Sequence, residues 1–132
     1  MLYLKDLEMK EVKFDIKPIP KPRMTQSDRW RGRSVVERYY IYKDGLNILA
    51  NEIKFSLPRN FKIDFYLSMP KSWSRKKRSE FLGKPHHQKP DLDNLIKAFM
   101  DALEQEDKDV WHIDASKYWS DSNYMIIKWD GD

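Results

Sequence analysis

The chain has 132 residues, 40% of them apolar, which suits one compact domain with a single core. It holds no cysteine and no apolar run of about eighteen residues, which excludes a disulfide framework, a thiolate metal site and a membrane-spanning helix. The first residues mix charges with apolar side chains and lack the apolar block of a secretory signal, so we expect a cytoplasmic protein.

The net charge of +4 is modest, but its distribution is uneven. Residues 21–34 hold five basic residues against one acid, and residues 71–89 hold seven against one. Residues 101–132 hold three basic residues against nine acids. This asymmetry favours a surface that binds a polyanion, built around a carboxylate site that takes cations; ordinary solvated charge is the alternative.

Residues 10–19 alternate apolar and polar side chains and predict a half-buried strand, which the following prolines end. We interpret residues 1–10 as an N-terminal extension.

The loop at 21–34 places Trp30 among basic residues, which suits phosphate contacts with stacking on a base, although the tryptophan fits a core position equally well. The residues of this loop predicted to contact DNA are Lys21, Arg23, Arg29, Arg31 and Arg33.

Residues 35–55 predict a helix with one apolar side, which we assign to the core or to a dimer contact. Residues 61–69 alternate apolar and polar side chains, and they predict the clearest strand of the chain.

Residues 70–90 begin and end with proline and form the most basic segment. The pattern predicts a short helix that Ser72 or Ser74 caps and Gly83 stops. The length of the segment indicates a substrate-binding loop that becomes ordered on binding. The residues predicted to contact DNA here are Lys71, Arg75, Lys76, Lys77, Arg78, Lys84 and Lys89.

His86 and His87 are neighbours in this loop, and neighbouring side chains do not face one metal from a regular element. The four-residue spacing of helical zinc ligands is also missing. We therefore reject a zinc site and assign both histidines to the loop, where they would contact phosphate.

Residues 91–103 predict a half-buried helix, because apolar side chains recur at three- and four-residue spacing. Asp91 and Asp93 stand at its start, and Asp93, Lys97 and Asp101 follow every four residues, so they share one side. The helix dipole favours acids in a first turn, so capping explains the two aspartates adequately. Mg²⁺ also requires carboxylate oxygens, and the spacing alone leaves cap and metal site open.

A polar turn follows, and the short apolar stretch at 110–114 ends in Asp114, which would complete a metal cluster. Residues 117–129 predict the last strand. The order strand, helix, strand, helix, strand predicts a small mixed α/β domain of the α+β kind, with a mixed β-sheet and two main helices.

The stretch KPDLDNLIKAFMDAL, followed by VWHIDAS, resembles the pattern of the RusA family of Holliday-junction resolvases. That pattern runs Asp-x-Asp-Asn-Leu-x-Lys, then Asp-Ala-Leu, then an aromatic followed by two acids. The segments PKPRMT and MPKSWSRKKR resemble forms carried by phages and prophages. The family consists of Mg²⁺-dependent endonucleases that cut four-way DNA junctions as homodimers, and the resemblance covers most of the chain.

The resemblance implies that Asp91, Asp93 and Asp114 hold the metal and that Lys97 stabilises the transition state or orients water. It gives Asp101 a supporting role, either tuning Lys97 or joining the dimer contact. One position departs from the family: Ile113 stands where the first of the two acids belongs. The resemblance makes the second acid the catalytic one; if the first were the ligand, the protein would bind junctions and cut them poorly.

We therefore expect residues 1–132 to form one RusA-like domain that resolves four-way DNA junctions as a homodimer, with Mg²⁺ as cofactor and Mn²⁺ as a substitute. Such a nuclease would serve DNA recombination or repair. The alternatives are a branched-DNA-binding protein with weak or no cleavage, a flap or branch nuclease on the same scaffold, and a small basic domain that assembles with protein partners.

Overall fold

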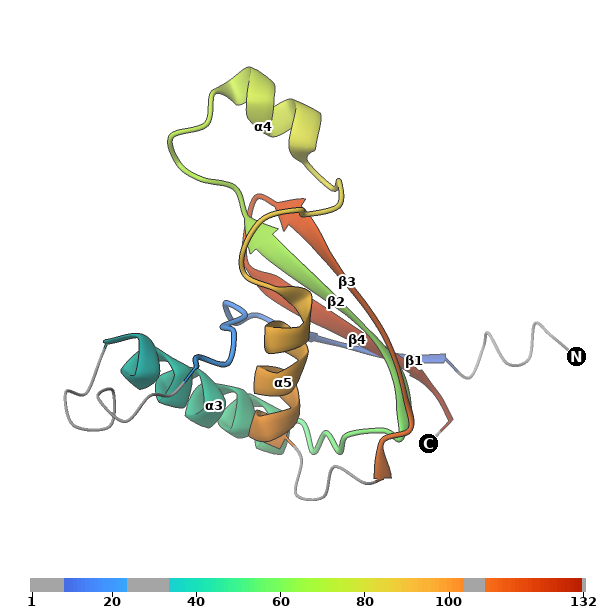
Figure 1. Cartoon of the computed structure of the whole chain (residues 1–132). Coiled ribbons are helices and arrows are strands. Elements are labelled where there is room, and N and C mark those ends of the chain that lie inside the picture. Colours follow the sequence, from blue (N-terminus) through green and yellow to red (C-terminus); the bar gives the residue numbers. More distant parts are fainter. Residues whose placement is uncertain (1–8, 24–33, 104–108, 132) are drawn as a thin grey trace, which may run out of the picture.

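A computed structural model describes residues 9–23, 34–103 and 109–131. These residues form the strands β1 (Met9–Phe14), β2 (Asn60–Ser68), β3 (His112–Ser120) and β4 (Tyr124–Asp130), and the helices α3 (Ser34–Glu52), α4 (Arg75–Phe81) and α5 (Leu92–Leu103). Helices α3 and α5 lie on one side of the sheet, and α4 stands away from it on an arm (Figure 1). The predicted α+β class, with a small mixed sheet and two main helices, is confirmed.

The four strands are arranged in the order β1-β4-β2-β3. Strands β2 and β3 are parallel, whereas β4 runs antiparallel to β1 and β2. Parallel neighbours cannot be joined by a tight turn, so the chain between them makes a crossover, and this crossover contains α4 and α5.

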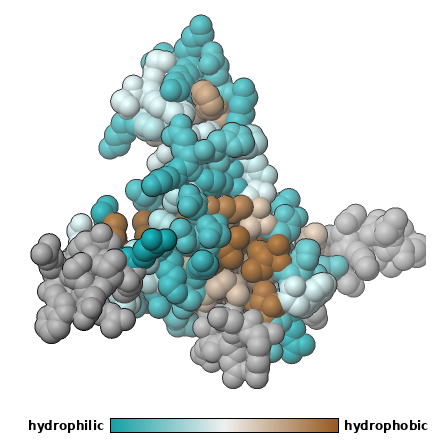
Figure 2. Space-filling model, viewed as in Figure 1, coloured by the Kyte–Doolittle hydropathy of each residue, from teal (hydrophilic) through white to brown (hydrophobic). Residues whose placement is uncertain are grey.

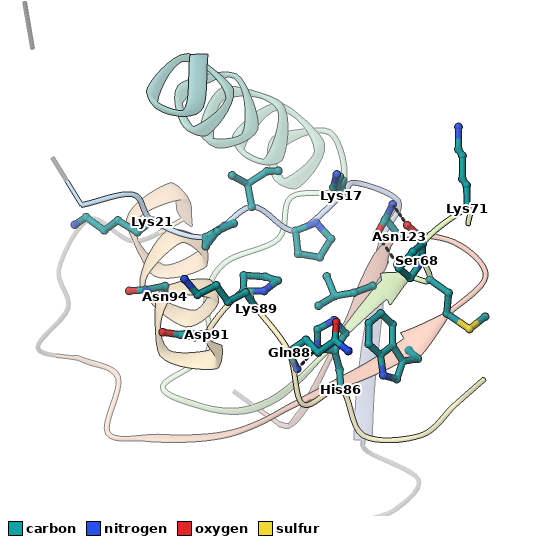
Figure 3. Close-up of a pocket in the computed structure, with 18 residues that line it drawn as sticks. Lys17, Lys21, Ser68, Lys71, His86, Gln88, Lys89, Asp91, Asn94 and Asn123 are labelled. Carbon is teal, nitrogen blue, oxygen red and sulfur yellow. Dashed lines mark hydrogen bonds between the residues drawn. The ribbon is translucent and has the colours of Figure 1, made fainter. Parts of the chain in front are cut away.

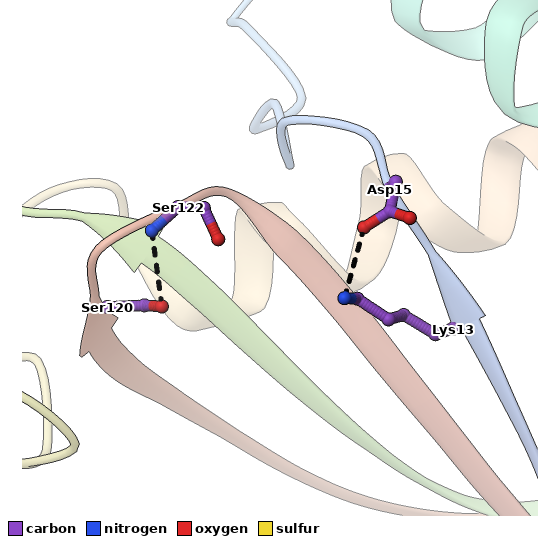
Figure 4. Close-up of polar contacts among 4 residues, drawn as sticks. All are labelled: Lys13, Asp15, Ser120 and Ser122. Atoms are coloured by element: carbon purple, nitrogen blue, oxygen red, sulfur yellow. Dashed lines mark hydrogen bonds and ion pairs between the residues drawn. The ribbon is translucent and has the colours of Figure 1, made fainter.

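The connection from β3 to β4 passes the end of β2, because these two strands flank it. There the Met69 N–H donates to the Ser120 carbonyl at 3.0 Å. The Asn123 side chain accepts from the Ser68 N–H at 2.9 Å and donates to the Ser68 hydroxyl at 3.1 Å. Within the turn, the Ser122 N–H donates to the Ser120 hydroxyl at 3.4 Å (Figure 4). These bonds satisfy polar groups where the ladder ends.

The core fills the space between the sheet and the helices α3 and α5. Every second side chain of β2 faces it, and α5 contributes residues spaced three and four apart, as the predicted patterns require. The buried residues of these two elements include Phe61, Ile63, Phe65, Leu67, Leu95, Ala98 and Phe99. The α3 side chains Tyr39, Tyr42 and Leu46 close the core. The helix was expected to extend to residue 55, but it ends at Glu52, and Ile53 beyond it is 53% exposed.

Two predicted boundaries were wrong. The first strand was expected at 10–19, but β1 begins at Met9 and ends at Phe14. The strand ends just before Asp15, whose carboxylate forms an exposed ion pair with Lys13 at 3.3 Å (Figure 4), and prolines follow a few residues later in the sequence. The single strand expected at 117–129 is two strands, and β3 already begins at His112.

In the part of the chain that the structure describes, each helix is too short or too polar to cross a membrane.

Candidate functional site

Asp91 directly precedes α5, and its backbone starts the helix. Its carbonyl accepts the N–H groups of Asn94 and Leu95, each at 3.2 Å. Among the described residues, no hydrogen bond joins the Asp91 carboxylate to the first helical amides. Capping therefore does not use this side chain, which is exposed beside a cleft (Figure 3).

Lys97 and Asp93 form the expected i, i+4 pair on the surface of α5. Their Nζ and Oδ2 atoms are 3.7 Å apart, and the side chains are 60% and 69% exposed. An exposed pair of this kind is weak, because water and salt screen it. Both groups are therefore available to a phosphate or a metal ion.

Asp101 does not contact Lys97, because its carboxylate has two other partners. The Tyr39 hydroxyl donates to it at 2.8 Å, and Lys21 Nζ lies 2.7 Å away. Burial raises the pKa of Asp101, but the hydrogen bonds from Lys21 and Tyr39 outweigh burial and lower it overall. The backbone N–H of Lys21 also donates to the Asn94 carbonyl at 2.9 Å. Asp101 thus fastens the segment after β1 to α5 and α3.

Asp114 lies on the face of the sheet that α5 does not cover. Side chains alternate along a strand, and its neighbours Ile113 and Ala115 pack against the core. Asp114 is level with Lys62 in the ladder to β2, so both point to the opposite face. Burial raises the pKa of Asp64 on that face; nearby lysine charges oppose this shift, and the charge of Asp114 adds to it.

The described ranges 9–23, 34–103 and 109–131 contain no group of three or more His, Cys, Asp or Glu side chains that could hold a metal ion. The structure therefore does not bring Asp114 to Asp91 and Asp93. Asp91 and Asp93, at the start of one helix, fit a metal site with only two protein carboxylates. Mg²⁺ is often held by one or two carboxylates, with water and substrate phosphate as its other ligands.

Lys117 is a site residue that the sequence reasoning missed. It points from β3 toward the start of α5, where its Nζ donates to the Pro90 carbonyl at 2.7 Å and also to the Gln88 carbonyl. Burial lowers the pKa of Lys117, and the charge of Asp91 opposes this shift. The only signal in the sequence is the alternation of side chains along the strand, which places Lys117 on the same side as the buried Trp119.

A cleft of about 730 Å³ opens beside Asp91 (Figure 3). The segment after β1 forms one wall, and the residues that follow β2 and precede α5 form the other. The lysines that line it are Lys17, Lys21, Lys71 and Lys89. A cleft with several lysines beside one acid favours an anionic ligand.

Aromatic packing holds the arm that carries α4. Trp73 lies against Phe81 and Trp119, with ring centroids 5.2 and 4.8 Å apart, and His86 stacks on Trp119 at 3.8 Å. The Gly83 N–H donates to the Trp119 carbonyl at 2.9 Å. These contacts fasten the arm to the end of β3; whether the segment changes its order on binding stays a prediction.

His86 does not fit the phosphate contact expected of it. Its side chain is buried, and burial together with the charge of Lys117 lowers its pKa, so the neutral imidazole is favoured. His87, by contrast, is exposed.

The basic side chains predicted to contact DNA differ in the partners that they have within the protein. Arg78 donates to the carbonyls of Pro70 at 2.9 Å and Trp73 at 3.3 Å, so it holds the base of the arm. Lys77 lies over the Trp73 ring at 4.3 Å. The arm surface is mostly hydrophilic (Figure 2), and its exposed cations are Lys71, Arg75, Lys76, Lys77 and Lys84. Arg29, Arg31 and Arg33, together with Trp30, lie outside the described residues.

An α+β fold with two exposed carboxylates at a helix start, a lysine-lined cleft and a basic arm suits a protein that acts on nucleic acid. The chain matches the family described as Endodeoxyribonuclease RusA over residues 15–128, and it belongs to that family. The family consists of endodeoxyribonucleases that act on DNA junctions, so the resemblance and the nuclease class inferred from the sequence are confirmed, whereas Mg²⁺ dependence and junction resolution stay predictions. A search of curated proteins gives no match to the chain.

Replacing Lys117 with Met should lower the free energy of unfolding by about 1–3 kcal/mol, because two carbonyls lose a charged donor. Urea unfolding measures this change. The matched control is Lys128→Met on β4, which removes an exposed partner of Glu11 and should cost less than about 1 kcal/mol. Equal losses in the two variants would contradict the role of Lys117.

Asp101→Asn should change how stability depends on pH. Since the folded pKa of Asp101 is lowered, its ionised form stabilises the fold above the ordinary aspartate pKa, and this contribution disappears as pH falls through the folded value. The stability difference between wild type and variant should therefore be constant near neutrality and shrink below about pH 4. Urea unfolding at several pH values tests this, with the exposed Asp130→Asn as control; a difference that grows in acid would rule it out.

Proposed function

We propose that this protein resolves four-way DNA junctions by hydrolysing phosphodiesters with a divalent metal ion, Mg²⁺ or Mn²⁺. One observation carries the proposal: the exposed carboxylates of Asp91 and Asp93 stand at the start of a rigid helix, next to a lysine-lined cleft. Membership of the RusA family supports junction DNA as the substrate.

Asp91 and Asp93 would hold the metal together with water and a DNA phosphate. When bound, such an ion activates water and neutralises charge at the scissile phosphate. Lys97 lies one turn further along α5, and its weak pairing with Asp93 leaves it able to turn to that phosphate or to the attacking water. Lys117 holds the backbone before α5 and thereby keeps Asp91 in place.

The exposed cations of the cleft and arm would bind the DNA backbone on either side of the cut. Contacts to phosphate position a nuclease without reading sequence. The described residues assigned to this role are Lys21, Arg23, Lys71, Arg75, Lys76, Lys77, Lys84 and Lys89. Arg78 is left out because its guanidinium binds two backbone carbonyls, whereas Lys21, although paired with Asp101, keeps 43% of its side chain exposed.

We further propose that two copies act together, which would allow symmetric cuts. Half-buried apolar residues of α5 and β3, including Ile96, Met100 and Ile113, support a contact there. Apolar surface gathers beside α5 in Figure 2. A one-chain mass in solution under conditions where the protein cuts junctions would contradict the pairing.

A second candidate function is junction binding with weak cleavage. It is favoured by the packing of Ile113 on the core side of β3, while Asp114 occupies the other face. Of positions 113 and 114, position 113 is the one on the side of the sheet that α5 covers.

Asp93→Asn should lower Mg²⁺-dependent cleavage of a four-way junction at least about 100-fold, because one metal ligand is lost. Junction affinity without metal should change little, since the cleft and arm are untouched. Rates from single-turnover cleavage and affinities from gel shifts measure the two effects. Asp130→Asn is the control, and full-rate cleavage by Asp93→Asn would make the metal-site assignment wrong.

Ile113→Asp should raise Mg²⁺-dependent cleavage above that of wild type, because it adds a carboxylate on the α5 side of β3. The companion variant Asp114→Asn should keep most of the wild-type rate. The same junction assay measures both, after thermal melts show that the variants fold. Loss of cleavage in Asp114→Asn would mean that Asp114 takes part in the reaction, against its placement here.

A further inference from the structure

The cleft beside Asp91 has an apolar floor as well as a basic rim. Leu67, Met69 and Trp119 form part of that floor and are 6%, 3% and 4% exposed. Ile19, which is half-buried, contributes to the facing wall. An apolar floor has no counterpart in the charged backbone of a DNA duplex, so phosphate binding alone does not explain it.

Contacts within the protein hold both walls of the cleft. On one side, Lys21 is bound through its backbone to Asn94 and through its ammonium to Asp101. On the other, Trp119 is stacked on His86. Binding sites for small organic groups are usually preformed, largely apolar clefts of roughly 300–1,000 Å³, and this cleft of about 730 Å³ has that size.

The charges around the floor match an anionic ligand with a flat apolar part. Lys21 and Lys71 lie at opposite ends of the cleft, with Lys89 between them and Asp91 close by (Figure 3). A nucleotide within a DNA strand has this form, because an apolar ring lies between two phosphates. At a branch point a base is less firmly paired, so the cost of extruding it is low.

We propose that this cleft binds one unpaired nucleotide of the DNA strand, with its base on the apolar floor and its phosphates toward the lysines. The inference rests on the proposed function, since it places that nucleotide beside the carboxylates that would cut the strand. The amide side chains of Gln88 and Asn94 also line the cleft and carry donors and acceptors that suit base edges.

The test compares two labelled probes by fluorescence anisotropy, an oligothymidylate of about six nucleotides and an abasic phosphodiester chain of equal length and charge. Wild type should bind the oligothymidylate at least about fivefold more tightly, as expected for one bound base. Ile19→Trp fills the cleft without changing charge, so it should remove this preference and leave the affinity for the abasic chain unchanged. Ile48→Trp, on the exposed side of α3, is the matched control and should keep the preference.

Equal affinity of wild type for the two probes would overturn the proposal, and that comparison needs no variant to fold. A preference that survives in a folded Ile19→Trp would also overturn it, because the base would then bind elsewhere. The proposed function fails by a different result, the absence of Mg²⁺-dependent junction cleavage by wild type, which the anisotropy measurement does not involve.

Discussion

Parallel pairing of β2 with β3 is the constraint on which the rest of the site depends. A parallel neighbour must be reached by a crossover, and everything between Met69 and Trp111 belongs to it. The arm leaves where β2 ends, and the chain returns to that same end of the sheet before α5 begins, as the contacts of Lys117 with the backbone before α5 show. The basic arm, the cleft and the carboxylates therefore gather at one end of the sheet.

Several positive charges at this end act on the protein itself. Arg78 holds the base of the arm, Lys117 holds the backbone before α5, and Lys21 joins the segment after β1 to α5. Charged donors are well suited to this work because their hydrogen bonds to carbonyls and carboxylates are stronger than neutral ones. The basic surface is thus only partly available to DNA. Arg78 and Lys117 hold the backbone of the site, whereas Lys21 pairs with Asp101 and also stays exposed to a bound phosphate.

The secondary structure was predicted correctly where the spacing of apolar residues in the sequence agrees with their burial in the fold. The elements β2 and α5 were found because each alternates or repeats against one core, whereas the catalytic role of the start of α5 stays a prediction. The turn between β3 and β4 was missed although Asp121, Ser122 and Asn123 all favour turns, because the apolar residues on both sides of them were interpreted as one strand. The sequence also did not show on which face of the sheet Asp114 and Lys117 lie. The face depends on the register of β3, and the pairing of β3 with β2 reveals that register.

The strand order also bears on how the sheet assembles. Strand β4 is the last of the described elements along the chain, yet it lies between β1 and β2, so Met9 is paired with Asp130. During synthesis, β1 therefore stays unpaired until β4, and with it almost the whole described chain, has emerged from the ribosome. Folding that depends on such distant pairs is slow, because loop-closure entropy is lost before the contacts form. In the meantime β1 exposes unpaired backbone, and the lysines and glutamate along it make association with other chains less favourable.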